Sequence, residues 1–293
     1  MKKIFALGFF DGVHLGHQQL LSACIRLAKQ HGYEAGVATF LGHPDTLVKG
    51  VTPTLINTLE DRKRLLESYG IDRVVELPFD ETLMTMNWRD YIRMLRSVYQ
   101  GAGFVCGSDF RFGYRGEGTV EILQNYCHAA GMPCAIVPEQ QLDGITVSST
   151  HIRTLLEEGR LEEANRFLGH PHILSGTVVS GRKLGRTIGV PTANLRLPED
   201  TVKLPHGVYA GKAVVEGREY LAVTNIGSRP TVGGHHVTVE AWLLDFAGDL
   251  YEKFVILEFH KFLRPEKHFA SLEELRREIE KNAAQTRKFF EKT

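Results

Sequence analysis

The sequence lacks the long apolar run that a membrane span requires. No stretch approaches the roughly 18 apolar residues of a transmembrane helix, and Asp11 with two histidines interrupts the apolar start, so we expect neither a membrane span nor a signal peptide. Basic and acidic residues number 35 each, which leaves no net charge to attract nucleic acid or a membrane surface. These absences predict a cytoplasmic protein that binds neither of them.

Cysteine is scarce, and repeats and low-complexity segments are absent. The four cysteines, Cys24, Cys106, Cys127 and Cys134, form no Cys-x-x-Cys pair, which favours reduced thiols in a core over a disulfide framework or a zinc site. The chain has 293 residues, 43% of them hydrophobic and 24% charged, and is long enough for two globular domains.

Residues 1–158 alternate short apolar strands with amphipathic helices. The expected strands are "IFALGFF", "EAGVATF", "RVVELPF", "GFVCGSDF" and "PCAIVPE". This alternation of strands and helices predicts a domain with a mostly parallel sheet covered by helices on both faces. Ligands of such sheets bind at the carboxyl ends of the strands.

The alternation of strands and helices ends after Gly159. Val237, Val239 and Ala241 follow a period of two, and several such segments succeed one another without helices. We expect a small antiparallel barrel over residues 173–293, closed by one helix that begins at the capping box "SLEE". Residues 159–172 are expected to be the linker.

The turn "GFFDGVHLGH", residues 8–17, joins the first expected strand to the first expected helix. Free N–H groups at a helix start favour an anion, and His14 and His17 can donate to phosphate oxygens. Three glycines let a bulky ligand approach the backbone: Gly8, Gly12 and Gly16. A glycine-rich loop with two surface histidines would have the same pattern, so the context must decide.

A second helix start follows the last expected strand of this half. Ser148, Ser149 and Thr150 are good N-cap residues, and Arg153, one turn later, has the planar fork that suits phosphate. Alone, this pattern is that of an ordinary capped helix with a solvated arginine. Combined with the histidine turn at the same sheet edge, it predicts a triphosphate site.

The second half carries its own polar motifs. "SGRKLGRTIGVPTANL", residues 180–195, can form an anion nest or a basic hairpin turn, and it is not a P-loop. Thr192 and Asn194 offer neutral oxygens to a Mg²⁺ that keeps several waters. Glu240 lies on a β-branched, aromatic strand, where it is either a structural ion-pair partner or the general base for a primary alcohol.

Together these motifs resemble the bacterial bifunctional riboflavin kinase/FAD synthetase family. "FDGVHLGH" and "SSTHIR" are similar to its adenylyltransferase half, a nucleotidyltransferase, and "GSDFRFGYRGEG" is similar to its flavin-side loop. No Lys-Met-Ser-Lys-Ser-like element of a tRNA synthetase is present. From about Leu174 to Phe290, "GVPTANL", "GVYAG", "NIGSRPTVGG", "VEAWLLDFAGDLY" and "FLRPEKHF" follow the order of the riboflavin kinase family.

The resemblance implies a Rossmann-like nucleotidyltransferase domain followed by a six-stranded antiparallel barrel with a C-terminal helix. It implies that ATP and Mg²⁺ convert riboflavin to FMN, and that a second ATP converts FMN to FAD with release of pyrophosphate. It does not indicate an oligomeric state.

The resemblance also implies roles for individual residues. Three are catalytic: His14, His17 and Glu240. The transferase ATP would contact Gly8, Phe10, Asp11, Gly12, Gly16, Ser148, Ser149, Thr150 and Arg153, and the flavin would contact Asp109, Phe110, Arg111 and Phe112. The kinase ATP would contact Gly181, Lys183, Gly185, Thr192 and Asn194, the last two of which would also hold Mg²⁺.

Four positions, in three segments, depart from the family pattern. Leu41 and Gly42 stand in "FLGHP" where the family has Phe-Asp-Pro-His-Pro, Glu252 replaces a common glycine, and Asn282 replaces a usual aspartate. The first departure leaves open a chain in which only the kinase half is active. A non-catalytic flavin or nucleotide sensor is a further alternative, disfavoured by the joint presence of both histidines, Thr192, Asn194 and Glu240.

Overall fold

The structure, a computed structural model, describes residues 1–179, 192–231 and 234–292. It contains two compact units, Met1–Ser149 and Thr150–Thr293, each described below by itself. The domain limits given above, residues 1–158 and 173–293, remain predictions about where each half folds independently. None of the described helices has the length and apolar character to cross a membrane.

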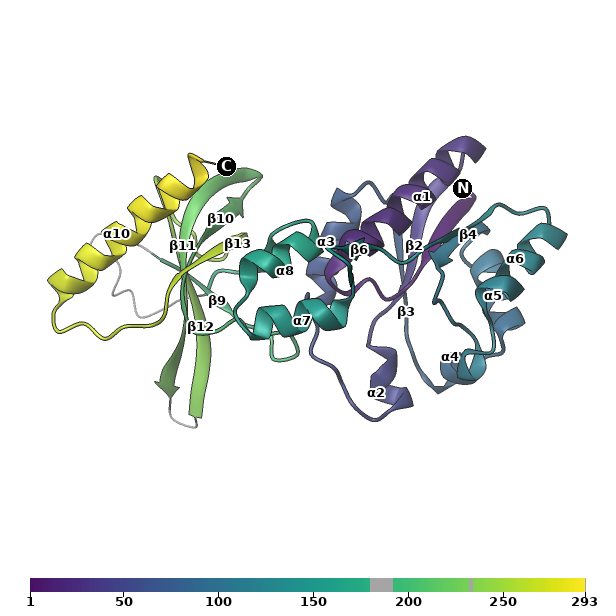
Figure 1. Cartoon of the computed structure of the whole chain (residues 1–293), viewed down its shortest axis with the longest axis horizontal. Coiled ribbons are helices and arrows are strands. Elements are labelled where there is room, and N and C mark those ends of the chain that lie inside the picture. The colour runs from purple at the N-terminus through teal and green to yellow at the C-terminus, as the bar shows by residue number, and fades with distance from the viewer. Residues whose placement is uncertain (180–191, 232–233, 293) are drawn as a thin grey trace. The chain divides into compact units, whose positions relative to one another are not determined.

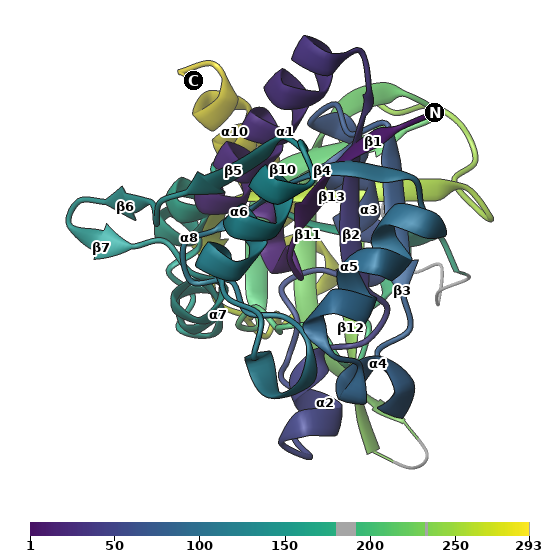
Figure 2. The ribbon, with the colours of Figure 1, turned by 90° about the vertical axis from the view of Figure 1, so that its right-hand side faces the viewer.

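The first unit is built on a five-stranded parallel sheet of order β3-β2-β1-β4-β5. The strands are β1 (Lys3–Leu7), β2 (Glu34–Phe40), β3 (Arg73–Leu77), β4 (Gly101–Gly107) and β5 (Cys134–Val137). All five lie within or overlap the strands expected from the apolar runs. A two-stranded hairpin, β6 (Gln141–Leu142) with β7 (Ile145–Thr146), follows β5 and projects from the sheet in Figure 2.

Helices cover both faces of this sheet. The described helices of this unit are α1 (Leu15–His31), α2 (Pro44–Val48), α3 (Leu59–Ser68), α4 (Glu81–Thr85), α5 (Trp88–Ser97) and α6 (Val120–Ala129), with short 3₁₀ turns η1 (Asp11–Val13) and η2 (Tyr114–Gly116). Helix α1 packs on one face, where the Cys24 thiol donates to the carbonyl of Ile4. Helices α5 and α6, in front of the strands in Figure 2, pack on the other face.

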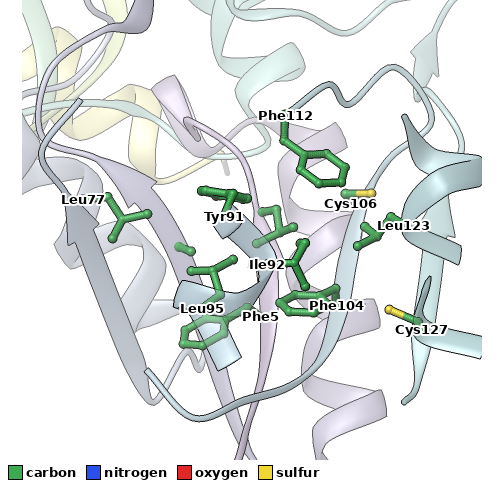
Figure 3. Close-up of a cluster of buried hydrophobic side chains, with 12 residues drawn as sticks. Phe5, Leu77, Tyr91, Ile92, Leu95, Phe104, Cys106, Phe112, Leu123 and Cys127 are labelled. Atoms are coloured by element: carbon green, nitrogen blue, oxygen red, sulfur yellow. The ribbon is translucent and has the colours of Figure 1, made fainter. Parts of the chain in front are cut away.

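An apolar core lies between the sheet and helices α5 and α6. Alternate strand residues such as Phe5 and Phe104 point to this face, where they meet Ile92 and Leu95 of α5 and Leu123 of α6 (Figure 3). All of these side chains are fully buried. Removing so much apolar surface from water is the main force that stabilises this unit.

The strand order places a ligand crevice at a defined point. From β1 the chain moves to β2 and β3 on one side, and then returns to place β4 on the other side of β1. At such a switch point the loops after two neighbouring strands diverge and leave a crevice at their carboxyl ends. Here the diverging segments follow Leu7 of β1 and Gly107 of β4.

The second unit contains a nearly closed six-stranded antiparallel barrel, as the resemblance implies. Its strands, in the order β8-β13-β10-β11-β12-β9, are β8 (His172–Thr177), β13 (Phe254–Arg264), β10 (Gly207–Val215), β11 (Arg218–Thr231), β12 (Gly234–Leu243) and β9 (Ala193–Arg196). A bridge between Val179 and Asn194 brings the two end strands together. Near closure leaves few strand edges unpaired.

Among the described residues of this unit, three segments are helical: α7 (Ser149–Glu157, from its second residue), α8 (Leu161–Leu168) and α10 (Leu272–Phe290). Helix α8 lies inside the segment predicted as a linker and packs on β13, where the Asn165 amide donates to the carbonyl of Phe259 at 2.8 Å. Helix α10 packs on β10 and β11 and begins at the expected capping box, with Ser271 Oγ accepting from the Glu274 N–H (Figure 1).

Two of the departures from the family pattern have local explanations. Glu252 has a φ of 61°, in the left-handed region that glycine adopts without strain. Asn282 is 1% exposed, and its amide oxygen accepts from Nε of Arg264 at 3.2 Å. A neutral amide therefore contacts this partly buried arginine where the family has a carboxylate, and Glu278 supplies the opposite charge at 3.5 Å.

His172 at the start of β8 should make the second unit sensitive to acid. Burial, with a smaller effect of His170, lowers the pKa of His172 from 6.5 to about 3. The unfolded chain binds the proton more tightly than the folded protein does, so the free energy of unfolding is highest above pH 6.5. It decreases as the pH drops towards 3, and the loss at pH 5 is about 2 kcal/mol. We expect His172→Phe to remove this loss, measured as the difference in unfolding free energy between pH 7.5 and pH 5. An unchanged pH dependence would contradict the assignment.

Candidate functional sites in the two units

The histidine turn lies at the switch point of the parallel sheet. After β1 the chain passes through Phe10, whose φ is 62°, and through Gly12, whose φ is 80°. It then enters α1 with His14 as the N-cap: Nδ1 of His14 accepts from the N–H of His17 at 3.4 Å. The two imidazoles are stacked, with ring centroids 3.6 Å apart and planes 15° from parallel. The fold therefore presents both histidines as one pair.

The glycine between the histidines has a steric reason. A Cβ added at Gly16 would lie 3.3 Å from the ring of His14, closer than most real Cβ contacts. Gly8, on the other side of the turn, would bring a Cβ to 3.2 Å from the ring of Phe10. Glycine at both positions keeps the backbone open beside the imidazole pair, as the sequence predicts.

A cavity of about 420 Å³ opens in front of this pair. Its walls come from the ends of β1, β4 and β5, from the start of α1 and from the segment that precedes α7. Nine residues of the predicted transferase site line it: Gly8, His14, Gly16, His17, Asp109, Phe110, Arg111, Ser148 and Ser149. The switch-point crevice and the motif residues thus coincide.

Other predicted transferase residues are placed differently. Asp11 is 3% exposed, and its carboxylate accepts from the backbone N–H of Ile56 at 2.9 Å. Phe10 and Gly12 are buried and shape the turn without lining the cavity. Phe112 is 6% exposed and belongs to the core cluster. Thr150 and Arg153 belong to α7 in the second unit, and their contact with ATP stays a prediction.

The environment of His17 disfavours its protonated form. Burial, followed by the neighbouring imidazole of His14 and the guanidinium of Arg62, holds the pKa of His17 well below its usual value of 6.5. Nδ1 of His17 is buried and has no hydrogen-bond partner among the described residues, so no protein contact there fixes the tautomer. A neutral imidazole at neutral pH can still donate one N–H to a phosphate oxygen.

The predicted flavin-side loop is a tight hairpin. Phe112 and Gly118 pair with each other, and Nη1 of Arg111 donates to the carbonyl of Gly116 at 3.4 Å. The rings of Phe110 and Phe112 are stacked, with centroids 5.7 Å apart. This hairpin presents one aromatic ring and one guanidinium to the cavity, which suits a planar ligand that bears a phosphate.

The departure at Leu41 and Gly42 lies next to this site. Leu41 is 45% exposed. His43, one residue further, contacts the ring of Phe9 with centroids 4.6 Å apart, and Phe9 lines the cavity. The replaced acid and proline therefore stand at the border of the transferase site.

The barrel brings a second set of predicted residues together across three strands. Glu240 of β12 is directly opposite Asn194 of β9 and directly opposite Asn225 of β11. Side chains opposite one another in an antiparallel pair lie on the same face, with Cβ atoms about 5 Å apart. Asn194, Glu240 and Asn225 thus form a polar row.

The row lies on the outer face of the barrel. Val239 and Ala241, on either side of Glu240, are fully buried in the barrel core, whereas all three residues of the row are partly exposed. Trp242, the next outward residue of β12, packs with the apolar cluster that includes Ala283 of α10. The polar row therefore continues an apolar surface, an arrangement suited to a ligand with a flat ring and a hydroxylated chain.

Asn225 was not singled out in the sequence, although it lies in "NIGSRPTVGG". Its importance follows from strand register, which a motif read in one dimension does not reveal. Nearby, the carboxylate of Glu266 lies against Gly227, so a side chain at position 227 would require Glu266 to move. The prediction for Gly181, Lys183 and Gly185 lies outside the described residues.

The donor set at the row fits Mg²⁺ bound chiefly to a nucleotide. Among the described residues no group of three His, Cys, Asp or Glu side chains could enclose a metal ion. Thr192 lies beside the row, with its carbonyl 3.5 Å from the Asn194 amide. Neutral oxygens of this kind, with water and phosphate, are typical ligands of Mg²⁺.

Comparisons with known proteins agree with this geometry. Residues 1–151 match the FAD synthetase family model and residues 168–290 match the riboflavin kinase model. A bifunctional riboflavin kinase/FMN adenylyltransferase of Listeria monocytogenes is 35% identical over 295 residues, covering 100% of this chain and 94% of the relative. The Escherichia coli K12 protein of the same name is 35% identical over 290 residues, covering 98% and 92%.

A solved structure shares the whole fold. A crystal structure described as a macrolide-efflux protein from Streptococcus pneumoniae superposes with a TM-score of 0.84 at 29% identity, covering 98% of this chain and 94% of that one. Both family models, the full-length relatives and the two sites built above therefore agree. This chain belongs to the bifunctional riboflavin kinase/FMN adenylyltransferase family.

Proposed function

We propose that this protein makes FMN from riboflavin in its barrel unit and FAD from FMN in its parallel-sheet unit, with one ATP consumed at each step. The observation that carries the transferase assignment is the stacked His14–His17 pair on a cavity at the switch point of the sheet. The kinase assignment depends on the row of Asn194, Glu240 and Asn225.

In the transferase unit, an oxygen of the FMN phosphate attacks the α-phosphorus of ATP. The bond from that phosphorus to the β-phosphate oxygen breaks, and pyrophosphate leaves with the electron pair. His14 and His17 donate hydrogen bonds to the phosphate oxygens as their negative charge grows. Ser148 and Ser149, on the cavity wall at the start of α7, add donors for the triphosphate. No covalent enzyme intermediate is required.

In the kinase unit, Glu240 accepts the proton of the ribityl 5′-hydroxyl while that oxygen attacks the γ-phosphorus of ATP, and ADP leaves. Thr192 and Asn194 would hold Mg²⁺, which neutralises charge on the phosphates. Asn225 lies opposite Glu240 and orients the carboxylate or a chain hydroxyl. The partly exposed position of the row lets the substrate chain reach it.

We further propose that the protein acts in the cytoplasm and has neither nucleic acid nor membrane as a partner. Equal numbers of basic and acidic residues, 35 of each, support this proposal, since a bulk electrostatic attraction to either surface needs an excess of positive charge.

Supplying FMN with ATP and Mg²⁺ tests the transferase assignment and the kinase-only alternative together. We expect FAD and pyrophosphate in equal amounts. No FAD from FMN, together with FMN formation when riboflavin is supplied in a parallel assay, would support the alternative in which only the kinase half is active. Tight flavin binding without any turnover would instead support the alternative of a non-catalytic flavin or nucleotide sensor.

A fragment of residues 150–293 should fold and make FMN without FAD. Helix α7 belongs to this unit, and the ring of His151 packs on Phe167 of α8 with centroids 4.8 Å apart. A fragment that starts at residue 160 loses this contact and should be less stable. Circular dichroism and product chromatography on both fragments check this expectation. A longer fragment that remains unfolded would contradict an independent kinase unit.

A further inference from the structure

Arg62 is a fully buried cation beneath the transferase cavity. It lies in the first half of α3, which begins after the N-cap Thr58, and it is 2% exposed. Its Nη1 donates to the carbonyl of Phe9 at 3.0 Å, and its Nη2 donates to the carbonyl of Phe40 at 2.7 Å. The guanidinium also lies 4.2 Å from the centre of the Phe9 ring. One side chain thus joins the segments that leave β1 and β2.

The carbonyl of Phe9 lies where the histidine turn begins, and the carbonyl of Phe40 lies at the end of the neighbouring strand β2. Phe9 is followed by Phe10 in a left-handed conformation and by Gly12 with positive φ. A turn with such backbone angles persists only where its surroundings hold it. The Phe9 carbonyl also accepts from Oγ1 of Thr39 at 2.9 Å. Without Arg62, the carbonyl of Phe40 would lose its 2.7 Å donor and that of Phe9 one of its two donors.

We propose that Arg62 is a positioning residue for adenylyl transfer: its bidentate hold on the carbonyls of Phe9 and Phe40 fixes the turn that carries His14 and His17. The proposal rests on the function proposed for this unit. Arg62 is not among the residues that line the cavity, so it acts through the histidine pair and not by touching ATP.

The charge of Arg62 adds an electrostatic effect. Burial lowers the pKa of Arg62 to about 10, and the carboxylates of Asp11 in η1 and Glu76 in β3 oppose that fall. Arg62 therefore remains protonated at neutral pH. With His14, it is one of the two side chains whose charge disfavours protonation of His17. Loss of this charge should raise the pKa of His17.

Two substitutions separate the hydrogen bonds from the charge. Arg62→Met removes both, whereas Arg62→Lys keeps the charge but can no longer hold both carbonyls through a planar fork. The control is Arg64→Met on the same helix, where the guanidinium is partly exposed and pairs with Glu60 at 2.9 Å. The measurements are kcat and KM for FAD formation from FMN and ATP, the rate of riboflavin phosphorylation, and the His17 pKa by NMR titration.

We expect Arg62→Met to lower kcat for FAD formation about 100-fold, as a small displacement of catalytic groups does, with little change in the KM for ATP. Arg62→Lys should lose about tenfold and keep the low pKa of His17, which Arg62→Met should raise. Riboflavin phosphorylation and the Arg64→Met enzyme should be unaffected.

Wild-type kcat in folded Arg62→Lys and Arg62→Met enzymes would overturn the proposal. A loss of activity that only matches the fraction of unfolded protein, measured by circular dichroism, would overturn it as well. If Arg62→Met does not fold, the result for Arg62→Lys decides whether the proposal holds. A wild-type enzyme that makes no FAD would overturn the proposed function and this proposal with it. FAD formation by the wild type and by both variants at equal rates would overturn this proposal alone.

Discussion

Replacing His14 with asparagine and His17 with alanine is expected to abolish FAD formation while riboflavin phosphorylation continues. Each substitution removes an imidazole donor from the position where phosphate charge grows, and the loss of one such donor commonly costs about 3 kcal/mol of transition-state stabilisation, or about 100-fold in rate. The double variant should therefore fall below detection in a direct assay with FMN and ATP. Product chromatography measures both activities in one sample.

The choice of asparagine separates catalysis from folding. His14 is the N-cap of α1 and accepts from the N–H of His17. Asparagine can accept the same bond and is among the best N-cap residues, whereas alanine would cost about 1 kcal/mol of stability. His128→Ala, at an exposed position of α6 in the same unit, is the matched control. Equal loss of both activities, or near wild-type FAD formation, would contradict the role given to the pair.

Glu240→Gln is expected to have the second large effect, on the kinase alone. Glutamine keeps the size of the side chain and can still form hydrogen bonds, but it cannot take the hydroxyl proton. Loss of a general base typically lowers the rate about 10²–10⁴-fold. FMN formation should fall into that range, riboflavin should still bind, and supplied FMN should still become FAD.

A matched variant controls for the loss of one negative charge on the barrel. Glu219 on β11 is exposed and pairs with Lys212 at 2.7 Å, so Glu219→Gln should phosphorylate riboflavin normally. If Glu240→Gln phosphorylates riboflavin at a rate near that of the wild type, Glu240 is a structural partner of its neighbours. The proton would then leave without a protein base.

The elements with strong periodicity could be predicted from the sequence. The run "EAGVATF" coincides with β2, and the period of two around Glu240 placed Val239 and Ala241 correctly on the opposite face. Such patterns predict strands correctly because burial of a strand requires apolar residues at the buried positions, and their spacing can be seen in the sequence. The change of period near Gly159 likewise indicated that a barrel follows a parallel sheet.

Features that depend on contacts between distant segments could not be predicted. Arg62 is one of several basic residues in "LEDRKRLLES", and only the packing of α3 shows that it alone is buried with two carbonyl partners. Asn225 became a candidate only when the register of β11 and β12 placed it opposite Glu240. The sequence also does not reveal that the ring of Phe112, in the flavin-side loop, packs in the core; its role toward the flavin stays a prediction.

The most direct test is a time course in which the purified protein receives only riboflavin, ATP and Mg²⁺. If both units are active, FMN appears first and then declines as FAD accumulates, with one pyrophosphate released for each FAD. FMN that rises to a plateau with no FAD, or riboflavin that remains unchanged, would contradict a single chain that performs both steps.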